Sequence, residues 1–270
     1  MVLLRKLKWK MISVIRKKMK NSERIKSIDK ALNLLEHLSS KEEEIGIAKL
    51  SKELNLALST VHRILTTLKS RKYIIQNPQT KKYRLGIKLF ALGCEVQGIK
   101  NLIKLTKPHL ENLSQITNET SNLAILEGKE VIYLDTIESS EVLRTEIIPG
   151  TRTPAHCAAL GKALLAFLSD NEFNGLYSNN EPLLSLTSKS ISSLDELKNK
   201  LKEIRIQGYA LDLEEYKIGI NCIGVPIFGR NGETIAAISI TGPASRFTLD
   251  EMEKVKDILM TISQEISNQL

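Results

Sequence analysis

The stretch IAKLSKELNLALSTVHRILTTL, residues 47–68, contains two short amphipathic helices separated by a tight turn. In the first helix Ile47, Leu50 and Leu54 recur at helical spacing and predict one buried face. Asn55 follows directly, and Asn tolerates the left-handed backbone conformation that ends many helices. We therefore expect the first helix to end at Asn55 and a second to begin within a few residues.

The second helix combines a buried apolar face with an unusual polar one. Ser59 is expected to cap its N-terminus, and Val61, Ile64, Leu65 and Leu68 supply the buried face. No acidic residue lies between Leu54 and Leu85. Hydroxyls and Arg near a helix start can contact base edges in a major groove, and Lys can hold phosphates. The candidate DNA-contacting residues of this helix are Ser59, Thr60, His62, Arg63, Thr66 and Lys69.

Helix and hairpin patterns flank this pair of helices. Residues 25–38 predict an earlier helix, followed by an exposed loop at residues 41–44. After the second helix, Tyr73–Gln76 and Lys81–Leu85 are β-prone and enclose a polar turn, which predicts a hairpin. A hairpin with cations at its tip, directly after a helix-turn-helix, is the wing of a winged helix; a purely structural lobe is the alternative. The buried face predicted for the earlier helix consists of Ile28, Ala31, Leu32, Leu35 and Leu38, and the candidate wing contacts are Lys81, Lys82 and Arg84.

Charge divides the chain into a basic and an acidic part. Residues 1–100 hold 23 Lys and Arg against 8 Asp and Glu, a net charge of +15, whereas residues 101–270 hold 16 against 23, a net charge of −7. This asymmetry suits a protein that binds a polyanion with one part and a small metabolite with the other. The three cysteines are far apart and form no CxxC pair, so we expect a reducing cytoplasm, with no disulfide framework and no structural zinc.

The first twenty residues contribute +8 of the charge and form a basic extension, residues 1–23. Interspersed cations exclude a signal peptide, and no run in the chain is long and apolar enough for a membrane helix. Three interpretations stay open for the extension. It is an arm that touches DNA phosphates, a weak amphipathic surface helix, or untranslated sequence before a start at Met11 or Met19, which we favour.

The helix-turn-helix of residues 47–68, with the Tyr83-Arg-Leu-Gly86 segment, resembles the DNA-binding module of the IclR family of bacterial transcription regulators. The resemblance implies a winged helix-turn-helix domain over residues 24–86, followed by linker helices over residues 87–118 that pair two subunits. Apolar residues in two helical stretches, 86–92 and 102–117, agree with a homodimer contact, although part of the linker is also expected to pack on its own domain.

The remaining residues, 119–270, predict an α+β domain with a mainly antiparallel sheet. Strands are expected at 122–126, 131–136, 143–148, 208–211, 222–228 and 235–241. Helices are expected after the Gly150-Thr-Arg-Thr-Pro loop, at 193–207 and at 249–270. The segments Gly208–Glu215, Gly219–Pro226 and Ala236–Pro243 also resemble the effector domain of IclR proteins, which implies a GAF-like fold.

Three places in this domain can hold a small carboxylate. A loop-to-helix entry at residues 159–161 offers backbone N–H groups beside small side chains. Two hydroxyls alternate along one strand, so both project to one face, and an Asp and a Cys lie at the ends of neighbouring strands. The resemblance places effector contacts at about these positions, which are Ala159, Leu160, Gly161, Asp212, Cys222, Ser239 and Thr241.

An enzyme is the competing interpretation. His156 and Cys157 are adjacent, and Cys222 could act near Asp212, yet adjacent side chains generally point apart and no base with an orienting partner is evident. A metal site from Asp212, Cys222 and another ligand is conceivable, but we expect neither metal nor cofactor.

The sequence therefore predicts a non-enzymatic, sequence-specific transcription regulator, with repression favoured over activation. It would bind a near-palindromic double-stranded operator as a homodimer or homotetramer and respond to a small carboxylate. A metabolite-processing enzyme and a non-specific DNA-compacting protein are the alternatives.

Overall fold

The computed structural model describes residues 25–41, 43–96, 98–177 and 182–270. The basic extension predicted for residues 1–23 lies outside the described residues. The chain divides between Val96 and Gln97 into two compact units, each of which is described by itself. No helix in the part of the chain that the structure describes has the length and apolar content to cross a membrane.

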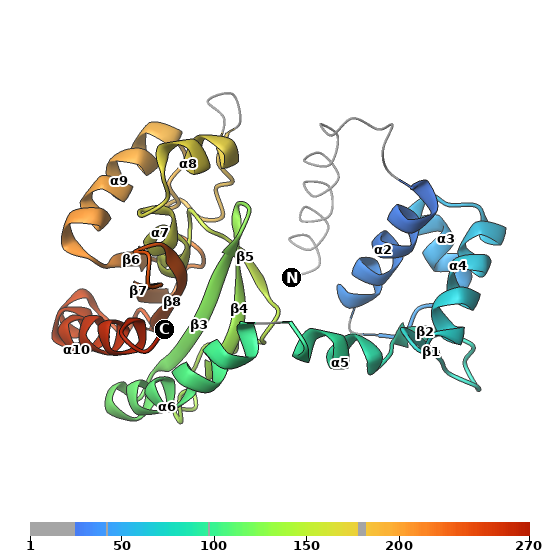
Figure 1. The fold of residues 1–270 in the computed structure, drawn as a ribbon, viewed down its shortest axis with the longest axis horizontal. Helices are drawn as coiled ribbons and strands as arrows, with labels where there is room; N and C mark the ends of the chain where they lie inside the picture. Colours follow the sequence, from blue (N-terminus) through green and yellow to red (C-terminus); the bar gives the residue numbers. More distant parts are fainter. Residues whose placement is uncertain (1–24, 42, 97, 178–181) are drawn as a thin grey trace. The chain divides into compact units, whose positions relative to one another are not determined.

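The first unit is a winged helix (Figure 1). It contains α2 (Lys26–Ser39), α3 (Ile47–Leu54), α4 (Leu58–Ser70), β1 (Ile74–Gln76) and β2 (Tyr83–Leu85). Asn55 ends α3 in the left-handed conformation, at φ 51°, as its sequence position predicts. Strands β1 and β2 pair antiparallel, and Ile45 bridges to Tyr83 on the other edge of β2. The core under the helices consists of Leu34, Leu38, Ile45, Leu50, Val61, Leu65, Leu68, Ile74 and Tyr83.

Two predictions for this unit are wrong in detail. The buried residues of α2 are Leu34, His37 and Leu38, whereas Ile28 and Leu32 are exposed. Leu38 is buried as predicted and Leu35 packs partly buried on the core, so helical spacing alone was wrong at the N-terminal part of this face. Ser59 does not cap α4: the helix begins at Leu58, and Ala57, whose methyl group cannot accept a hydrogen bond, is the N-cap residue.

The predicted linker consists of two helices with different surroundings. Helix α5 (Lys88–Cys94) belongs to the first unit, and α6 (Ile99–Thr117) belongs to the second. Leu102, Leu110 and Leu113 of α6 are buried against the sheet of the second unit. In contrast, Ile87, Phe90 and Leu92 around α5 are exposed by 75%, 68% and 48%. The part of the linker that packs on its own domain is therefore α6.

The described residues of the second unit form a six-stranded sheet in the order β5-β4-β3-β8-β7-β6, with every neighbouring pair antiparallel. The α+β class and the antiparallel sheet predicted from the sequence are confirmed. The strands are β3 (Thr120–Glu127), β4 (Glu130–Ile137), β5 (Arg152–Pro154), β6 (Ala210–Leu213), β7 (Ile220–Phe228) and β8 (Thr234–Pro243).

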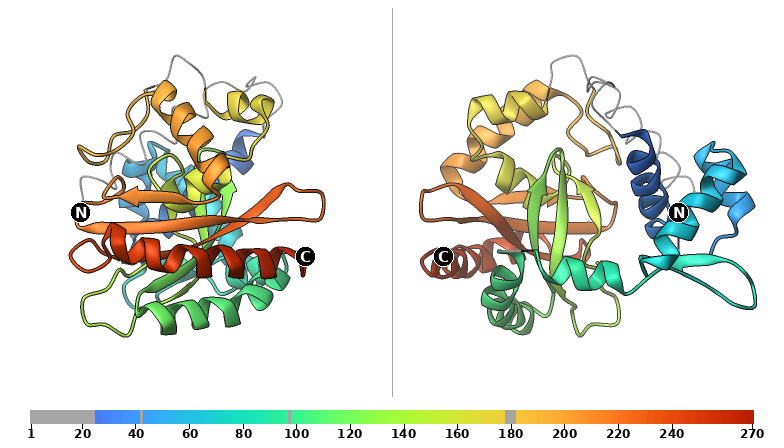
Figure 2. Two further views of the ribbon diagram at one scale, coloured as in Figure 1. Left: turned by 90° about the vertical axis from the view of Figure 1, so that its left-hand side faces the viewer. Right: turned by 45° about the vertical axis from the view of Figure 1, so that its right-hand side comes forward.

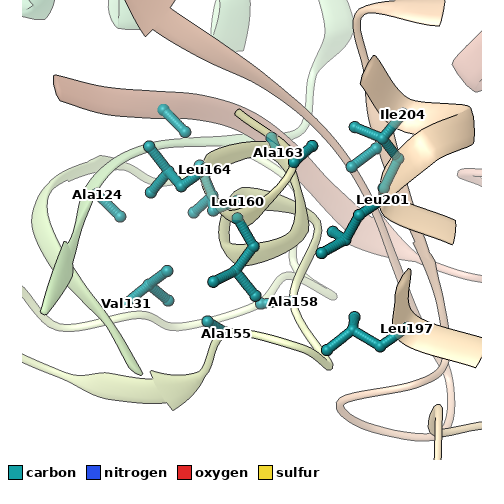
Figure 3. Packing of buried hydrophobic residues seen from close by; sticks show 14 of the residues in the cluster. Ala124, Val131, Ala155, Ala158, Leu160, Ala163, Leu164, Leu197, Leu201 and Ile204 are labelled. Carbon is teal, nitrogen blue, oxygen red and sulfur yellow. The ribbon is translucent and has the colours of Figure 1, made fainter. Parts of the chain in front are cut away.

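Helices cover both faces of this sheet (Figure 2). On one face lie α6 and α10 (Leu249–Ser267), which pack on Leu123, Val225 and Ile238. On the other face α7 (Ala159–Leu165) lies against the strands, with α9 (Leu194–Gln207) packed on it. Figure 3 shows Leu160 and Leu164 of α7 among side chains of the sheet and of α9. A short helix that the sequence did not predict, α8 (Asp170–Leu176), begins at a capping box formed by Ser169 and Glu172.

The strand predicted at residues 143–148 is absent from this described segment. Pairing on the outer edge of β4 begins only at Gly150, whose N–H donates to Tyr133 O at 2.7 Å, and continues into β5. The chain before it is therefore a loop, with Val142 exposed by 98%. The β-prone residues of this segment predicted a strand, but a local pattern does not report where pairing along β4 ends.

Candidate DNA-binding surface and ligand site

The polar side of α4 is available to a partner. Ser59, His62, Arg63 and Lys69 are exposed, and Thr60 is half-buried at the first turn. Thr66 is exposed too, but its hydroxyl donates to His62 O (2.9 Å) within the helix. The Thr66 hydroxyl therefore has only its lone pairs left for a base or phosphate.

Side-chain hydrogen bonds connect α4 to the wing. The Lys69 ammonium donates to Gln76 Oε1 (2.7 Å), and Gln76 Nε2 donates to Lys81 O (3.1 Å). Lys81 has a left-handed backbone, φ 57°, and its side chain is exposed, as is that of Lys82. Lys69 of the helix and Lys81 of the hairpin are thus connected through Gln76.

Glu44 is a wing contact that the sequence interpretation missed. Its Oε2 accepts from Asn77 Nδ2 (2.9 Å) and Thr80 Oγ1 (3.2 Å), and its Oε1 lies 3.5 Å from Arg84 Nε. Asn77 Oδ1 in turn accepts the Gln79 and Thr80 N–H groups, which closes the turn. A carboxylate from the loop after α2 therefore fixes the wing tip, although the sequence grouped Glu44 with an exposed acidic run.

In the second unit the predicted ligand residues meet on one face of the sheet. Asp212 pairs with Cys222, and Cys222 pairs with Thr241, so these three side chains lie in one row across β6, β7 and β8. Ser239, two residues from Thr241, lies on the same face and pairs with Asn122 of β3. Asp212, Ser239 and Thr241 are buried and Cys222 is partly exposed.

The start of α7 lies against this polar face. Gly224 of β7 makes the approach possible, because a Cβ there would lie 3.0 Å from Ala159 C and Leu160 N. The first intrahelical bond runs from Lys162 N to Ala158 O (2.9 Å), so the N–H groups of Ala159, Leu160 and Gly161 are those that a helix start leaves without helical partners. The side chain of Leu160 points into the apolar core, so its contribution to a site is its backbone (Figure 3).

Gly161 has a packing role of its own. A Cβ at this position would lie 2.2 Å from Ala155 O, so the missing side chain admits the chain before α7. The absence of a side chain at Gly161 therefore lets the protein's own backbone approach the start of α7.

A buried charge cluster lies beside the polar row. The Lys162 ammonium, fully buried, pairs with the Glu215 carboxylate. Asp212 Oδ1 accepts the N–H groups of Glu215 (2.8 Å) and Tyr216 (3.3 Å). The pKa of Asp212 is raised to about 7, chiefly by burial; the Lys162 ammonium opposes this rise and the neighbouring Glu215 carboxylate adds to it. Burial is also the first cause of the raised pKa of Glu215.

The thiols are poorly suited to catalysis. Burial raises the pKa of the Cys222 thiol well above its ordinary value, and that of Cys157 to about 12, so both stay protonated at neutral pH. His156 Nε2 and Cys157 Sγ both contact Leu184 O, at 2.9 and 3.6 Å, so the expectation that these adjacent side chains point apart is wrong. Within the described ranges no group of three or more His, Cys, Asp or Glu side chains is placed to hold a metal ion.

The sequence interpretation also missed Asn122 and Lys162. Asn122 is a fully buried amide within an apolar strand, and Lys162 is a fully buried cation within an alanine-rich helix. A polar residue at the core position of a predicted strand or helix is the signal that could have found both.

Comparisons with known proteins agree with this architecture. Residues 27–78 match the family model of the IclR helix-turn-helix domain, and residues 95–268 match that of the C-terminal domain of bacterial IclR transcriptional regulators. The chain therefore belongs to the IclR family of transcription regulators. It joins a helix-turn-helix DNA-binding domain to an effector-binding domain, and its relatives are regulators rather than enzymes.

Individual relatives cover nearly the whole chain. The HTH-type transcriptional regulator KdgR of Dickeya chrysanthemi is 36% identical over 98% of this chain and 88% of its own. The transcriptional repressor IclR of Escherichia coli is 30% identical over 90% of this chain and 89% of its own. The crystal structure of Thermotoga maritima IclR is 29% identical, with a TM-score of 0.72 over 92% of this chain and 99% of that one. An IclR homologue from Microbacterium hydrocarbonoxydans complexed with 4-hydroxybenzoate, 20% identical over 90% of this chain and 100% of that one, shares the fold with a TM-score of 0.79.

Proposed function

We propose that this regulator represses transcription from a near-palindromic operator and that a small carboxylate metabolite modulates its affinity for DNA. The observation that carries the proposal is the polar row of Asp212, Cys222 and Thr241, with Ser239 beside it, against the start of α7. Such a concentration of polar groups under a helix start suits a small anion, because hydroxyls and helix-end N–H groups both donate.

On the DNA side, α4 would enter the major groove and the wing would hold phosphates. Arg63 is exposed on α4, which supports a role in contacting base edges, whereas Lys81 is exposed on the wing turn, which supports a phosphate contact. Arg63→Ala should therefore weaken specific binding far more than non-specific binding. Lys81→Ala should weaken both and flatten the dependence of affinity on salt. Equal effects of the two substitutions would contradict this division of roles.

The assembly we propose is a homodimer, or a homotetramer formed by two dimers, in the cytoplasm. Operator symmetry calls for two copies of α4. The exposed apolar residues around α5, which include Ile87 and Phe90, offer a contact surface on each chain. Ligand binding would alter the geometry of the pair, and a coupling of about 1–3 kcal/mol would change operator affinity by roughly 5- to 150-fold.

The test is binding to the DNA upstream of the protein's own gene and to random DNA, near physiological salt, with and without a panel of small acids. The panel includes 4-hydroxybenzoate, because a protein of the same fold was crystallised with it. Specific binding that one acid changes would support the proposal. Equal binding to both DNAs, unaffected by every acid, would favour non-specific DNA compaction instead.

A further inference from the structure

Asn122 occupies the centre of the polar face, and its amide contacts the hydroxyls of Ser239 and Thr241 on β8. Its Nδ2 donates to Ser239 Oγ (3.2 Å) and to Thr241 Oγ1 (3.1 Å). The residue is fully buried, on the middle strand β3. Both N–H bonds of the amide are therefore directed to the two hydroxyl oxygens predicted to contact the effector.

The orientation of this amide is held from the opposite side. The Thr136 hydroxyl, on β4, donates to Asn122 Oδ1 at 3.2 Å. With its oxygen engaged by a donor, the amide presents its NH₂ group, which can only donate, toward β8. The hydrogen bonds thus all run in one direction, from the donor on β4 through Asn122 on β3 to the acceptor hydroxyls on β8.

This direction decides what the two hydroxyls can do. A hydroxyl carries one hydrogen and two lone pairs. Because Ser239 and Thr241 each accept a hydrogen bond from Asn122, their own hydrogens remain to be donated elsewhere. Thr241 Oγ1 also lies 3.1 Å from Cys222 Sγ. A thiol sulfur is a weak acceptor, so an entering carboxylate oxygen is the better partner for the Thr241 hydrogen.

We propose that Asn122 is a positioning residue that sets the hydrogen-bond polarity of the ligand site, so that Ser239 and Thr241 act as a matched pair of donors to an anionic oxygen. This inference rests on the proposed function, because it explains why the site would select a carboxylate. Asn122 orients the contacting groups without touching the ligand. If residue 122 offered acceptors in place of donors, the Ser239 and Thr241 hydroxyls would donate their hydrogens to it. They would then present only lone pairs to the ligand.

The polarity itself can be measured without knowing the effector. In the full chain labelled with ¹⁵N-asparagine, nuclear magnetic resonance observes the two Nδ2 protons of Asn122 separately. Ser239→Ala should shift one proton resonance, Thr241→Val should shift the other, and Thr136→Val should disturb both. If neither β8 substitution moves either resonance, the amide does not donate to the hydroxyls and the inference is overturned.

The consequence for binding is tested with Asn122→Asp, which keeps the shape of the side chain but offers acceptors in place of donors. Calorimetry with acetate, pyruvate and 4-hydroxybenzoate, each beside its uncharged amide, gives the affinities. For an acid that binds the wild type, we expect a loss of roughly 10- to 100-fold in Asn122→Asp, with the amide affected less. Thr136→Val, which leaves Asn122 in place, should lose less affinity than Asn122→Asp.

Asn221→Asp is the matched control. Asn221 is also a buried asparagine of this sheet, and its Nδ2 donates to Phe247 O (2.9 Å), but it precedes Cys222 and so lies on the opposite face. Thermal unfolding of both variants separates lost stability from lost affinity. Equal acid binding in Asn122→Asp, Asn221→Asp and the wild type would overturn the inference. If no acid binds the wild type while the amide resonances respond as described, the proposed binding of a carboxylate is wrong, and so is the role of Ser239 and Thr241 as donors to it. The direction of the hydrogen bonds from Asn122 to the two hydroxyls would still be established.

Discussion

Replacing Asp212 by Asn should stabilise the protein at high pH and have no such effect in acid. Burial raises the pKa of Asp212 from 3.8 to about 7 in the folded state. Between these values the unfolded chain ionises the group while the folded chain keeps it protonated, so stability falls as pH rises. Each tenfold change in an acid dissociation constant corresponds to about 1.4 kcal/mol, so a pKa raised by about 3 costs the folded state about 4 kcal/mol above pH 7.

Asn keeps the oxygen that accepts the Glu215 and Tyr216 N–H groups but cannot ionise. Urea unfolding followed by circular dichroism at pH 5, 6, 7 and 8 would measure the difference in free energy of unfolding between Asp212→Asn and the wild type. We expect it to grow by about 2 kcal/mol from pH 5 to pH 7 and to approach its plateau near pH 8. Asp257→Asn, the same substitution at an exposed position of α10, is the control. A difference that does not change with pH would refute the assignment of a buried, protonated Asp212.

Three further outcomes follow from the contacts described above. Glu44→Ala should weaken DNA binding several-fold in fluorescence anisotropy, although it removes a negative charge, because the wing tip loses the carboxylate that holds Asn77 and Thr80. Glu43→Ala, at the exposed neighbouring residue, is the control. Tighter DNA binding by both variants would contradict the role of Glu44. Gly161→Ala should lower the free energy of unfolding by about 3 kcal/mol, because its Cβ would meet Ala155 O. Gly175→Ala in α8 should not lower it, because a Cβ there meets nothing within 4 Å. Equal thermal stability of the two variants would count against the close approach at Gly161. The affinity for a carboxylate, measured by calorimetry, should rise from pH 8 to pH 6, because Asp212 takes up a proton and no longer repels the ligand. A pH dependence that persists unchanged in Asp212→Asn would assign the effect to another group.

Much of the fold could be predicted from local signals. Asn55 ended α3 where an asparagine tolerates positive φ, and the apolar residues of α4 marked its buried face. The strand predicted at residues 143–148 failed for a non-local reason. Pairing with β4 is made by residues from Gly150 onward, and a local sequence pattern does not report where along a neighbouring strand the pairing stops.

The site was harder to predict because its supporting residues act at a distance in the sequence. Glu44 and Thr80 are 36 residues apart, and Lys162 and Glu215 are 53 apart. Asn122 meets Ser239 across 117 residues. No spacing rule for a helix or a strand covers such pairs, and only the tertiary fold of each unit brings them together. The candidate contacting groups could be selected from their chemistry and the family resemblance. A polar residue in an apolar strand or helix could have flagged Asn122 and Lys162, but their partners needed the three-dimensional structure.

The order of strands in the sheet also has a consequence for how the ligand domain is made. Strands β5, β4 and β3 come from one stretch of the domain and β8, β7 and β6 from a later one. Among the described residues, the two halves of the sheet pair with each other only between β3 and β8. Asn122 and Ser239 face each other across that join, so a nascent chain has no complete ligand site until β8 has been synthesised. Closing so long a loop is entropically costly and slow. A frameshift after β7 would therefore leave the winged helix intact and remove the site, which would convert a responsive regulator into an unresponsive DNA-binding fragment.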